Sequence, residues 1–522
     1  MNKKTTIKSE SESKQFAINM LFTIIAFVLN FGISFFLTQY ITNQFSSEAY
    51  GFVKLANDFT NYASLFSIPL NSMASRFLML EIERGNTAEA RKYYSSITIA
   101  NIVLAAIMIL PSVISIIFLE NILTIPSGLI FEVKITFLFT YVSFILNLLF
   151  STQGNCYYLT NKLGISSLRD ALMTILRVVV IISLFFLTIP KISYVAIGAL
   201  AATLFSVIFN CYYKKKLTPD LKFCHKEFEI RKIINVISSG IWNSITKLSQ
   251  IFSSGLDLLI TNLLIDAQMM GYLSVAKTIP ALVATFNTTI ANIFSPNLMK
   301  HYAKNDMIGL KKTAKSSIKF MCLFTSIPNA ILITMGEDFF KLWVPGQPSH
   351  LINILSVLTI INSCVTGPAQ PLYQIFTITN KVKQSSIVIL IYGALSIIIT
   401  CLCLIFTNLG VYAVAGVSLV GSLVVALVYH IPYAAKYIGL PKSTFFPEIG
   451  LNILSTALLC GVGYLVNLIM DMHTSWIIWF LGAGITGIIG LFMNFALILN
   501  KEERNFLFQK FFSAIKKTKG QI

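Results

Sequence analysis

The stretch YGFVKLANDFTNYASLFSIPLNSMASRF, residues 50–77, is about as long as a membrane span and mostly apolar, yet it contains Lys54, Asp58 and Arg76. An ionised side chain at the centre of a transmembrane helix costs roughly 2.5–3.5 kcal/mol. When successive residues are placed 100° apart, as in an α-helix, these charges fall on one face and the large apolar residues on the other. The polar face also carries Asn57 and Asn61. The stretch therefore predicts a membrane helix with a single polar stripe, in which Pro69 is a candidate bending point.

The whole chain has the composition of an integral membrane protein. Of its 522 residues, 55% are hydrophobic and 12% are charged, and its mean hydropathy is +0.74. Soluble domains carry about 25% charged residues, so this surface would not fold in water. Apolar runs of about 20 residues recur from end to end, which predicts helices rather than a barrel. The fold class expected is an all-α polytopic membrane protein.

Fourteen transmembrane helices are predicted, and their even number places both termini on one side. The spans are expected at residues 17–42, 50–79, 96–119, 132–153, 168–189, 192–213, 236–264, 268–298, 317–342, 350–378, 385–407, 410–434, 448–470 and 475–499. In this topology most Lys and Arg residues lie on the side of the termini. The exceptions are three on the outer side, Lys134, Lys191 and Lys341, and four inside spans, Lys54, Arg177, Lys247 and Lys277. This bias predicts cytoplasmic termini. It also explains the net charge of +18 without a nucleic-acid partner.

The two halves of the chain resemble one another. AYGFVKLANDF, which begins at residue 49, matches MMGYLSVAKTI, which begins at 269, and LTNKLGISS at 159–167 matches ITNKVKQSS at 378–386 with nearly the same spacing. A repeat of six spans keeps the same orientation, so it predicts two pseudo-symmetric six-helix bundles around a central cavity. The expected order is a cytoplasmic tail (1–16), an N-terminal bundle (17–213), a basic linker (214–235), a C-terminal bundle (236–434), two extra helices (448–499) and a basic cytoplasmic tail (500–522).

Other predicted spans repeat the polar stripe of residues 50–77. The seventh carries Asn243, Lys247, Gln250 and Asp257 on one side, and the first carries Asn19 and Asn30. The eighth carries Lys277 and the fifth carries Arg177. Polar faces inside a membrane must meet each other or water, so they predict a wet, charged cavity between the halves.

Two interpretations of these charges compete. In the structural one, Lys54 and Asp58 pair across one helical turn and neutralise each other. In the functional one, the cations bind an anionic ligand, because Lys247, Lys277 and Arg177 have no acidic residue one turn away. Arg76 lies near the expected cytoplasmic surface, where its side chain can also reach the interface.

Motifs for chemistry are missing from the sequence. It contains no phosphate-binding loop, nucleophile elbow or HExxH motif, and its five His residues are scattered. The cysteines fit core packing, without a disulfide framework or metal site. We therefore expect neither an enzyme nor a bound metal or cofactor.

The stretch FFLTQYITNQFSSEAYGFVKLANDFTNYASLF, followed by NSMASRFLMLEIERGN, resembles the polysaccharide transporter family, the O-antigen flippases of the Wzx type. This family is part of the multidrug/oligosaccharidyl-lipid/polysaccharide exporter superfamily, and the layout of spans agrees over about residues 15–500. The resemblance implies a flippase of the bacterial cytoplasmic membrane. It would move a lipid-linked oligosaccharide on undecaprenyl diphosphate, such as an O-antigen or capsule unit, to the outer leaflet by alternating access.

The resemblance also implies a site. Related peptidoglycan-lipid flippases line their cavity with arginines from the first, second and eighth spans. This sequence has Lys54 on the second span and Lys277 on the eighth span, but no cation on the first span. Lys247 on the seventh span is the candidate replacement for the missing cation. The candidate substrate-binding cations are thus Lys54, Arg76, Arg177, Lys247 and Lys277, and the candidate polar lining residues are Asn19, Asn30, Asn57, Asn61, Asn243 and Gln250.

Direction of transport needs an energy source. Asp58 and Asp257 are candidates for coupling to H⁺ or Na⁺, and removal of product by downstream polymerisation is the alternative. Expected partners are the lipid-linked oligosaccharide, bacterial membrane lipids, and a polysaccharide polymerase with its chain-length regulator. Two other functions compete: a cation-coupled multidrug antiporter, which would prefer an acidic cavity, and a membrane glycan polymerase or ligase, which the short outer loops disfavour.

Overall fold

The computed structural model describes residues 28–29, 31–160, 162–379, 381–501 and 503–504. In these ranges the chain forms α-helices joined by turns and short 3-10 and π segments, and no strand is present. The predicted all-α fold class is therefore confirmed. Two residues of the predicted polar lining, Asn19 and Asn30, lie outside the described residues.

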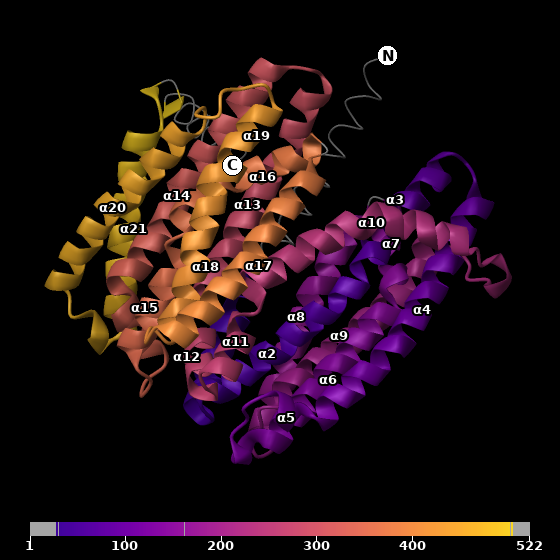
Figure 1. Cartoon of the computed structure of the whole chain (residues 1–522), viewed down its shortest axis with the longest axis horizontal. Coiled ribbons are helices and arrows are strands. Elements are labelled where there is room, and N and C mark those ends of the chain that lie inside the picture. Colours follow the sequence, from indigo (N-terminus) through magenta and orange to yellow (C-terminus); the bar gives the residue numbers. More distant parts are fainter. Residues whose placement is uncertain (1–27, 30, 161, 380, 502, 505–522) are drawn as a thin grey trace, which may run out of the picture. The chain divides into compact units, whose positions relative to one another are not determined.

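The helices group into two compact units, Met1–Val275 and Ala276–Ile522. Figure 1 draws the first mainly in indigo to magenta and the second in rose to yellow. Unit 1 contains the helix that runs through residues 31–44 and α2 (Ser47–Ala63), α3 (Ile68–Glu83), α4 (Thr87–Ile117), α5 (Leu119–Ile122), α6 (Ile130–Leu149), α7 (Asn155–Leu159), α8 (Leu163–Leu187), α9 (Tyr194–Leu217), α10 (Ile230–Gln250), α11 (Asp257–Leu264) and α12 (Ala267–Ala276).

Unit 2 follows α12 directly. It contains α13 (Thr278–Ala303), α14 (Met307–Trp343), α15 (Ser349–Ile360), α16 (Ser363–Ile378), α17 (Val382–Phe406), α18 (Val411–Val425), α19 (Ile431–Tyr437), α20 (Phe446–Ile469) and α21 (Trp476–Ile498). This division groups α10 to α12 with the N-terminal helices, whereas the sequence repeat assigns them to the second bundle. The predicted pseudo-symmetric bundles and their boundaries stay predictions.

Within the described residues, 11 helical segments are long and apolar enough to cross a membrane. They match the predicted spans from 96–119 to 192–213 and from 268–298 to 475–499. Three predicted spans do not meet the same test: 17–42, of which residues 17–27 and 30 lie outside the described residues, and the polar stretches 50–79 and 236–264. The chain is thus a multi-pass membrane protein, and the total of fourteen stays a prediction.

Each of the two polar stretches is an interrupted helix rather than one continuous helix. Residues 50–79 divide into α2 and α3 at a 3-10 turn over Ser64–Phe66, and Pro69 occupies the first turn of α3. Proline has no N–H to donate and fits this position. Near the break, the hydroxyls of Ser64 and Ser67 donate to the carbonyls of Asn61 and Ser64 at 2.6 and 3.0 Å. Such side-chain hydrogen bonds make a break tolerable inside a membrane.

The stretch 236–264 is interrupted by a π-helical turn over Ile251–Gly255, which separates α10 from α11. Single π turns inside α-helices occur frequently at functional sites. The sequence predicted a bend at Pro69 but contains no proline that would predict this second interruption.

Glycines let the helices of unit 1 approach closely. A Cβ on Gly240 of α10 would overlap the carbonyl oxygen of Pro69 in α3. At the start of α2, a Cβ on Gly51 would lie 3.1 Å from Cα of Gly271 in α12, and a Cβ on Gly271 would lie 2.5 Å from the carbonyl carbon of Ser47. Gly51 and Gly271 occupy equivalent positions in the sequence repeat, so the two copies of the repeat meet at their matching glycines.

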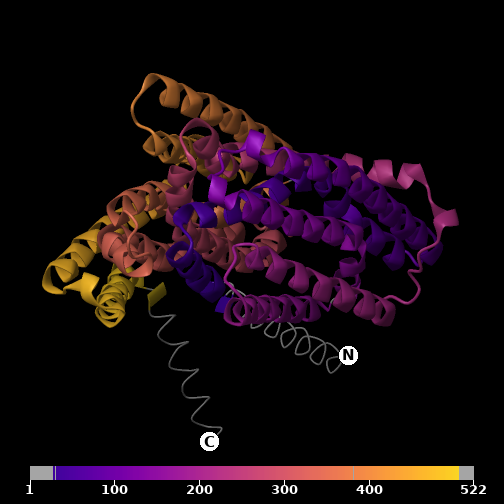
Figure 2. The ribbon, with the colours of Figure 1, turned by 90° about the horizontal axis from the view of Figure 1, so that it is seen from below.

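The last two spans pack on α14 of unit 2, and Figures 1 and 2 both show α20 and α21 side by side at the yellow end of the chain. Polar contacts hold them there. Lys315 pairs with Glu448 at 2.8 Å, and the Asn494 amide donates to the Ser326 hydroxyl at 2.7 Å. The Trp479 indole donates to the carbonyl of Met335 at 3.1 Å. Buried hydrogen bonds of this kind fix the register of helices whose surroundings are otherwise apolar.

Replacing Gly240 by Ala tests the close approach of α3 and α10. The added methyl group would overlap the Pro69 carbonyl, and overpacking of this kind costs roughly 1–3 kcal/mol. We expect a lower midpoint of thermal unfolding for the detergent-solubilised protein, measured by fluorescence-detected size exclusion. Gly484→Ala is the matched control, because a Cβ at Gly484 of α21 has no heavy atom within 4 Å. Equal midpoints for the two variants would contradict the packing.

Candidate functional site: the polar face of α2

The candidate site is built on one face of α2. The helix begins after Ser46, whose side chain accepts a hydrogen bond from the N–H of Ala49 at 3.2 Å. From there Tyr50, Lys54, Asp58 and Tyr62 follow at every fourth residue. Side chains spaced in this way lie over one another along a helix. The four side chains therefore form a stripe about 18 Å long, with a cationic part followed by an acidic part.

The cationic part is centred on Tyr50, which is buried at 3% exposure. The ammonium group of Lys54 lies 5.4 Å from the centroid of the Tyr50 ring. Arg177 of α8 is also close enough to Tyr50 for an electrostatic interaction. The structure thus brings Lys54 and Arg177, which are far apart in sequence, to the same tyrosine.

Among the described residues, no carboxylate forms an ion pair with either cation. In the described ranges, ion pairs within 4.0 Å join other residues, such as Lys232 to Glu89 and Lys319 to Glu503, but none involves Lys54 or Arg177. The buried Nε atom of Arg177 has no hydrogen-bond partner in this part of the chain. Among the described residues, no ion pair within 4.0 Å joins Lys54 to Asp58, the pair of the structural interpretation; the Lys54 ammonium group lies over the Tyr50 ring.

The acidic part is centred on Tyr62. Its hydroxyl donates to the carbonyl of Gly255 at 2.6 Å, which joins α2 to the π turn after α10. Asp58 and Asp257 both interact electrostatically with this hydroxyl. Asp257 is 7% exposed and begins α11 directly after the turn. The structure thus brings together the two carboxylates that the sequence proposed for ion coupling.

Neither tyrosine is among the site residues that the sequence predicts. Tyr50 and Tyr62 lie four residues before Lys54 and four residues after Asp58, so their spacing placed them near the polar stripe. Their contacts come from other helices, α8 for Tyr50 and the turn before α11 for Tyr62. A single helical stripe cannot reveal such contacts.

The other predicted residues are more dispersed. The Asn243 amide of α10 donates to the hydroxyl of Ser72 in α3 at 3.0 Å, whereas Asn57 donates back to the carbonyl of Val53 at 2.7 Å. Lys247 is half-buried in the last turn of α10, and Lys277 is the residue before α13 at the start of unit 2. The remaining members are exposed: Asn61, Arg76 and Gln250. Among the described residues, no group of three His, Cys, Asp or Glu side chains could hold a metal ion.

Solved structures of transporters share this fold. An inward-facing multidrug resistance MATE family transporter of the MOP superfamily gives a TM-score of 0.62 at 12% identity, over 81% of this chain and 97% of that one. Lipid II flippase MurJ, in an inward closed conformation, gives 0.60 at 16% identity, over 89% and 97%. A MOP superfamily transporter from Pyrococcus furiosus, described as having a binding pocket of reverse polarity, gives 0.60 at 13% identity, over 81% and 95%. The chain therefore has the fold of MATE and MOP-superfamily transporters.

In sequence, the chain is similar to the uncharacterized membrane protein EpsK of Bacillus subtilis strain 168. The two are 27% identical over 516 residues, which cover 97% of this chain and 99% of that protein. No protein-family model matches the sequence.

Replacing Tyr62 by Phe tests the contact between α2 and the π turn. The change removes one hydrogen bond and leaves the carbonyl of Gly255 without this donor, at a cost of roughly 0.5–1.5 kcal/mol. We expect a lower midpoint of thermal unfolding than for the unchanged protein. Tyr464→Phe is the control, because Tyr464 of α20 is 59% exposed. If Tyr62→Phe were as stable as Tyr464→Phe, the Tyr62 contact would not hold the turn.

Proposed function

We propose that this chain is a flippase that moves a lipid-linked oligosaccharide from the cytoplasmic to the outer leaflet of the bacterial cytoplasmic membrane by alternating access. The carrier would be undecaprenyl diphosphate, and both termini would be cytoplasmic. One observation carries the proposal. Lys54 and Arg177 both lie near Tyr50 within predicted spans, and no ion pair within 4.0 Å joins either to a carboxylate in the described part of the chain.

The cost of these cations argues for an anionic ligand. A buried charge without a partner is strongly unfavourable, and polar or charged groups in spans usually mark a substrate pathway. Lys and Arg both bind phosphate well, Lys as a compact charge and Arg through paired N–H donors. The diphosphate of a lipid carrier would supply the missing negative charge. Lys247, Lys277 and Arg76 are proposed as further cations of the same pathway.

The polar side chains near the stripe fit the rest of such a substrate. Asn61 of α2 and Gln250 of α10 are exposed, and the Asn243 amide of α10 donates to the Ser72 hydroxyl of α3. Amides and hydroxyls offer both donors and acceptors, which match sugar hydroxyls. The fold is compatible with this role, since MurJ shares it and is described as a lipid II flippase.

The acidic part of the stripe would serve coupling. Asp58 and Asp257 converge on Tyr62, where a carboxylate can bind H⁺ or Na⁺ and release it when the helices move. The π turn between α10 and α11 would be the element that changes conformation when H⁺ or Na⁺ binds or leaves. Polymerisation of the product, by a polymerase with its chain-length regulator, is the alternative source of direction. No cofactor or catalytic step is part of this proposal.

The same two carboxylates favour a second candidate function, a cation-coupled multidrug antiporter. A MATE transporter shares the fold, and convergent acids would suit a cationic drug. The cationic pair at Tyr50 argues against it, because a drug cation would meet two like charges there.

Lys54→Gln tests the anionic-ligand site in a host that lacks the native gene. Loss of one of two neighbouring cations should weaken binding of a diphosphate, since a charged hydrogen bond contributes roughly 1.5–3 kcal/mol. We expect about a tenfold or greater fall in export and single glycan units trapped on the cytoplasmic leaflet, measured by extracting lipid-linked glycans and testing their leaflet. Arg177→Gln should act in the same direction, and Lys54→Arg should keep most export.

Lys216→Gln is the matched control for these variants. It removes a cation from the exposed end of α9 in the same unit, and export should be unchanged at equal protein level. Full export by Lys54→Gln and Arg177→Gln would contradict the cationic site. Single units already on the outer leaflet of the deletion host would instead indicate a polymerase or ligase.

Asp58→Asn tests ion coupling. The amide cannot gain or lose a proton and binds cations weakly, so transport should no longer respond to an imposed H⁺ or Na⁺ gradient. The measurement is glycan translocation in inside-out membrane vesicles with and without each gradient. Asp220→Asn, at an exposed loop position, should respond like the unchanged protein. A normal gradient response of Asp58→Asn would remove Asp58 from the coupling mechanism.

A further inference from the structure

A groove in unit 2 runs between α17 and α18 and continues beside the π turn over Ala426–His430 that follows α18. Its volume is about 660 Å³, which is in the range of sites that bind organic ligands. Ile391 of α17 and Val428 of the π turn, one on each wall, are 57% and 67% exposed. Because both walls belong to candidate membrane spans, the groove lies at the depth of the acyl chains of a bilayer.

The half of the groove next to the π turn is apolar over the depth of one leaflet. A leaflet is about 15 Å of the hydrocarbon core, or about ten residues of helix. Over that distance the lining residues follow the spacing of one helical face on each wall: Val388, Ile391 and Leu395 on α17, and Val420, Val424 and Val428 opposite them. Such a lining fits a hydrocarbon chain and offers no partner to a polar ligand.

Tyrosine rings and lysines continue the groove at this end. Tyr429 lines the groove, and its ring stacks on that of Tyr433 with the centroids 4.7 Å apart. The ammonium groups of Lys436 and Lys442 lie 5.5 and 5.2 Å from the centroid of the Tyr433 ring. The apolar groove therefore ends at two cations.

A third lysine joins them from the residue before α17. The ammonium group of Lys381 lies 5.9 Å from the centroid of the Tyr437 ring, and that ring is 6.0 Å from the ring of Tyr433. The Tyr437 hydroxyl donates to the side-chain carbonyl of Gln384 in α17 at 2.5 Å. The start of α17, the end of α19 and the loop before α20 thus contribute one lysine each to the same cluster.

No ion pair within 4.0 Å joins these three lysines to a carboxylate in the described ranges. Two other lysines of unit 2 do have such partners, since Lys315 pairs with Glu448 and Lys319 pairs with Glu503. The cluster therefore presents uncompensated positive charge beside an apolar groove. With cytoplasmic termini, as the charge bias predicts, this end of the helices is at the cytoplasmic surface, where anionic lipids give the leaflet a negative potential.

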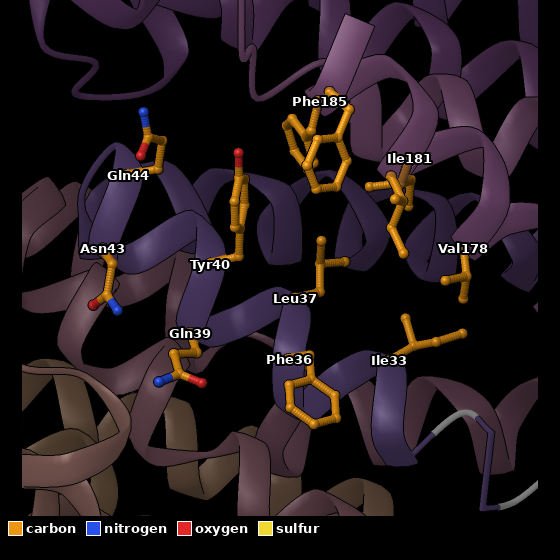
Figure 3. A pocket seen from close by; sticks show the side chains of 12 residues that line it. Ile33, Phe36, Leu37, Gln39, Tyr40, Asn43, Gln44, Val178, Ile181 and Phe185 are labelled. Carbon is orange, nitrogen blue, oxygen red and sulfur yellow. The ribbon is translucent and has the colours of Figure 1, made fainter.

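The groove of unit 1 shows that cations do not accompany every furrow between membrane helices. It runs between the helix of residues 31–44 and α8 and has a volume of about 550 Å³ (Figure 3). Two rings meet in it, those of Tyr40 and Phe185, with their centroids 4.5 Å apart. Among the described residues, no Lys or Arg lies over either ring. The lysines at Tyr433 and Tyr437 are thus a particular feature of the unit 2 groove.

We propose that unit 2 binds an anionic phospholipid of the cytoplasmic leaflet, with its phosphate at Lys381, Lys436 and Lys442 and an acyl chain in the adjoining half of the groove. Lysine binds phosphate as a compact charge, and basic pockets between membrane helices on the cytoplasmic side bind anionic head groups. A zwitterionic phospholipid would bring a further cation to three lysines, so the site selects against it. The bound lipid would hold the start of α17 to the end of α19, whatever substrate the protein moves.

The test uses the full-length protein in nanodiscs of phosphatidylcholine that contain phosphatidylglycerol with a diazirine in one acyl chain. After irradiation, mass spectrometry should locate adducts on residues 388–395 and 420–429. An excess of unlabelled phosphatidylglycerol should remove the labelling, and the same excess of phosphatidylethanolamine should not. These measurements need no variant, so they do not depend on the folding of one.

The lipid carrier of the proposed substrate is the other anionic lipid to compare. Polyprenyl phosphate should compete for the groove less well than phosphatidylglycerol does. Stronger competition by polyprenyl phosphate would overturn the assignment to a phospholipid. Absence of adducts in the groove, or equal competition by phosphatidylethanolamine, would overturn the site itself.

A matched pair of triple variants tests the cations. Replacing the three lysines of the cluster by Gln should lower labelling about tenfold or more, because each Lys at an anionic surface contributes to binding. The control removes three exposed lysines elsewhere in the same unit and so has the same net charge. The variants are Lys381→Gln, Lys436→Gln and Lys442→Gln against Lys300→Gln, Lys304→Gln and Lys311→Gln. Labelling of the control should equal that of the unchanged protein, and equal labelling of the two triple variants would overturn the proposal.

Discussion

A charge inside a membrane must find polar partners or water, and the structure of unit 1 is organised by that constraint. Along α2, Tyr50, Lys54, Asp58 and Tyr62 form one continuous stripe. Two irregular turns interrupt the helices around this stripe: the 3-10 turn over Ser64–Phe66 and the π turn over Ile251–Gly255. The Tyr62–Gly255 hydrogen bond joins the stripe to the second of these turns.

Close helix packing is the second requirement for this arrangement. Gly240 brings α10 against α3, and Gly51 and Gly271 bring the starts of α2 and α12 together. Gly51 and Gly271 match in the predicted sequence repeat, and their close approach holds the starts of α2 and α12 together within unit 1.

The sequence predicted the all-α class and the eleven membrane-spanning helices found among the described residues, because long apolar runs are a local property of the chain. It also predicted which face of α2 is polar. The sequence could not predict contacts between helices. Arg177 lies near Tyr50 because of how α8 packs, and Asp257 lies near Tyr62 because of how α11 packs. The π turn contains no residue type that marks it. The Lys54–Asp58 ion pair of the structural interpretation is not found within 4.0 Å among the described residues, where the Lys54 ammonium group lies over the Tyr50 ring.

Together these features describe a fold shared with MATE and MOP-superfamily transporters, in which α2 of unit 1 carries a cationic region followed by an acidic one. The most direct test of the flippase account is reconstitution of the purified chain in liposomes that hold its host's lipid-linked oligosaccharide. The account predicts that glycan becomes accessible on the opposite leaflet, unchanged in length and without ATP, while a cationic dye such as ethidium is not moved. Movement of ethidium with the glycan left in place, or a change in glycan length, would contradict it.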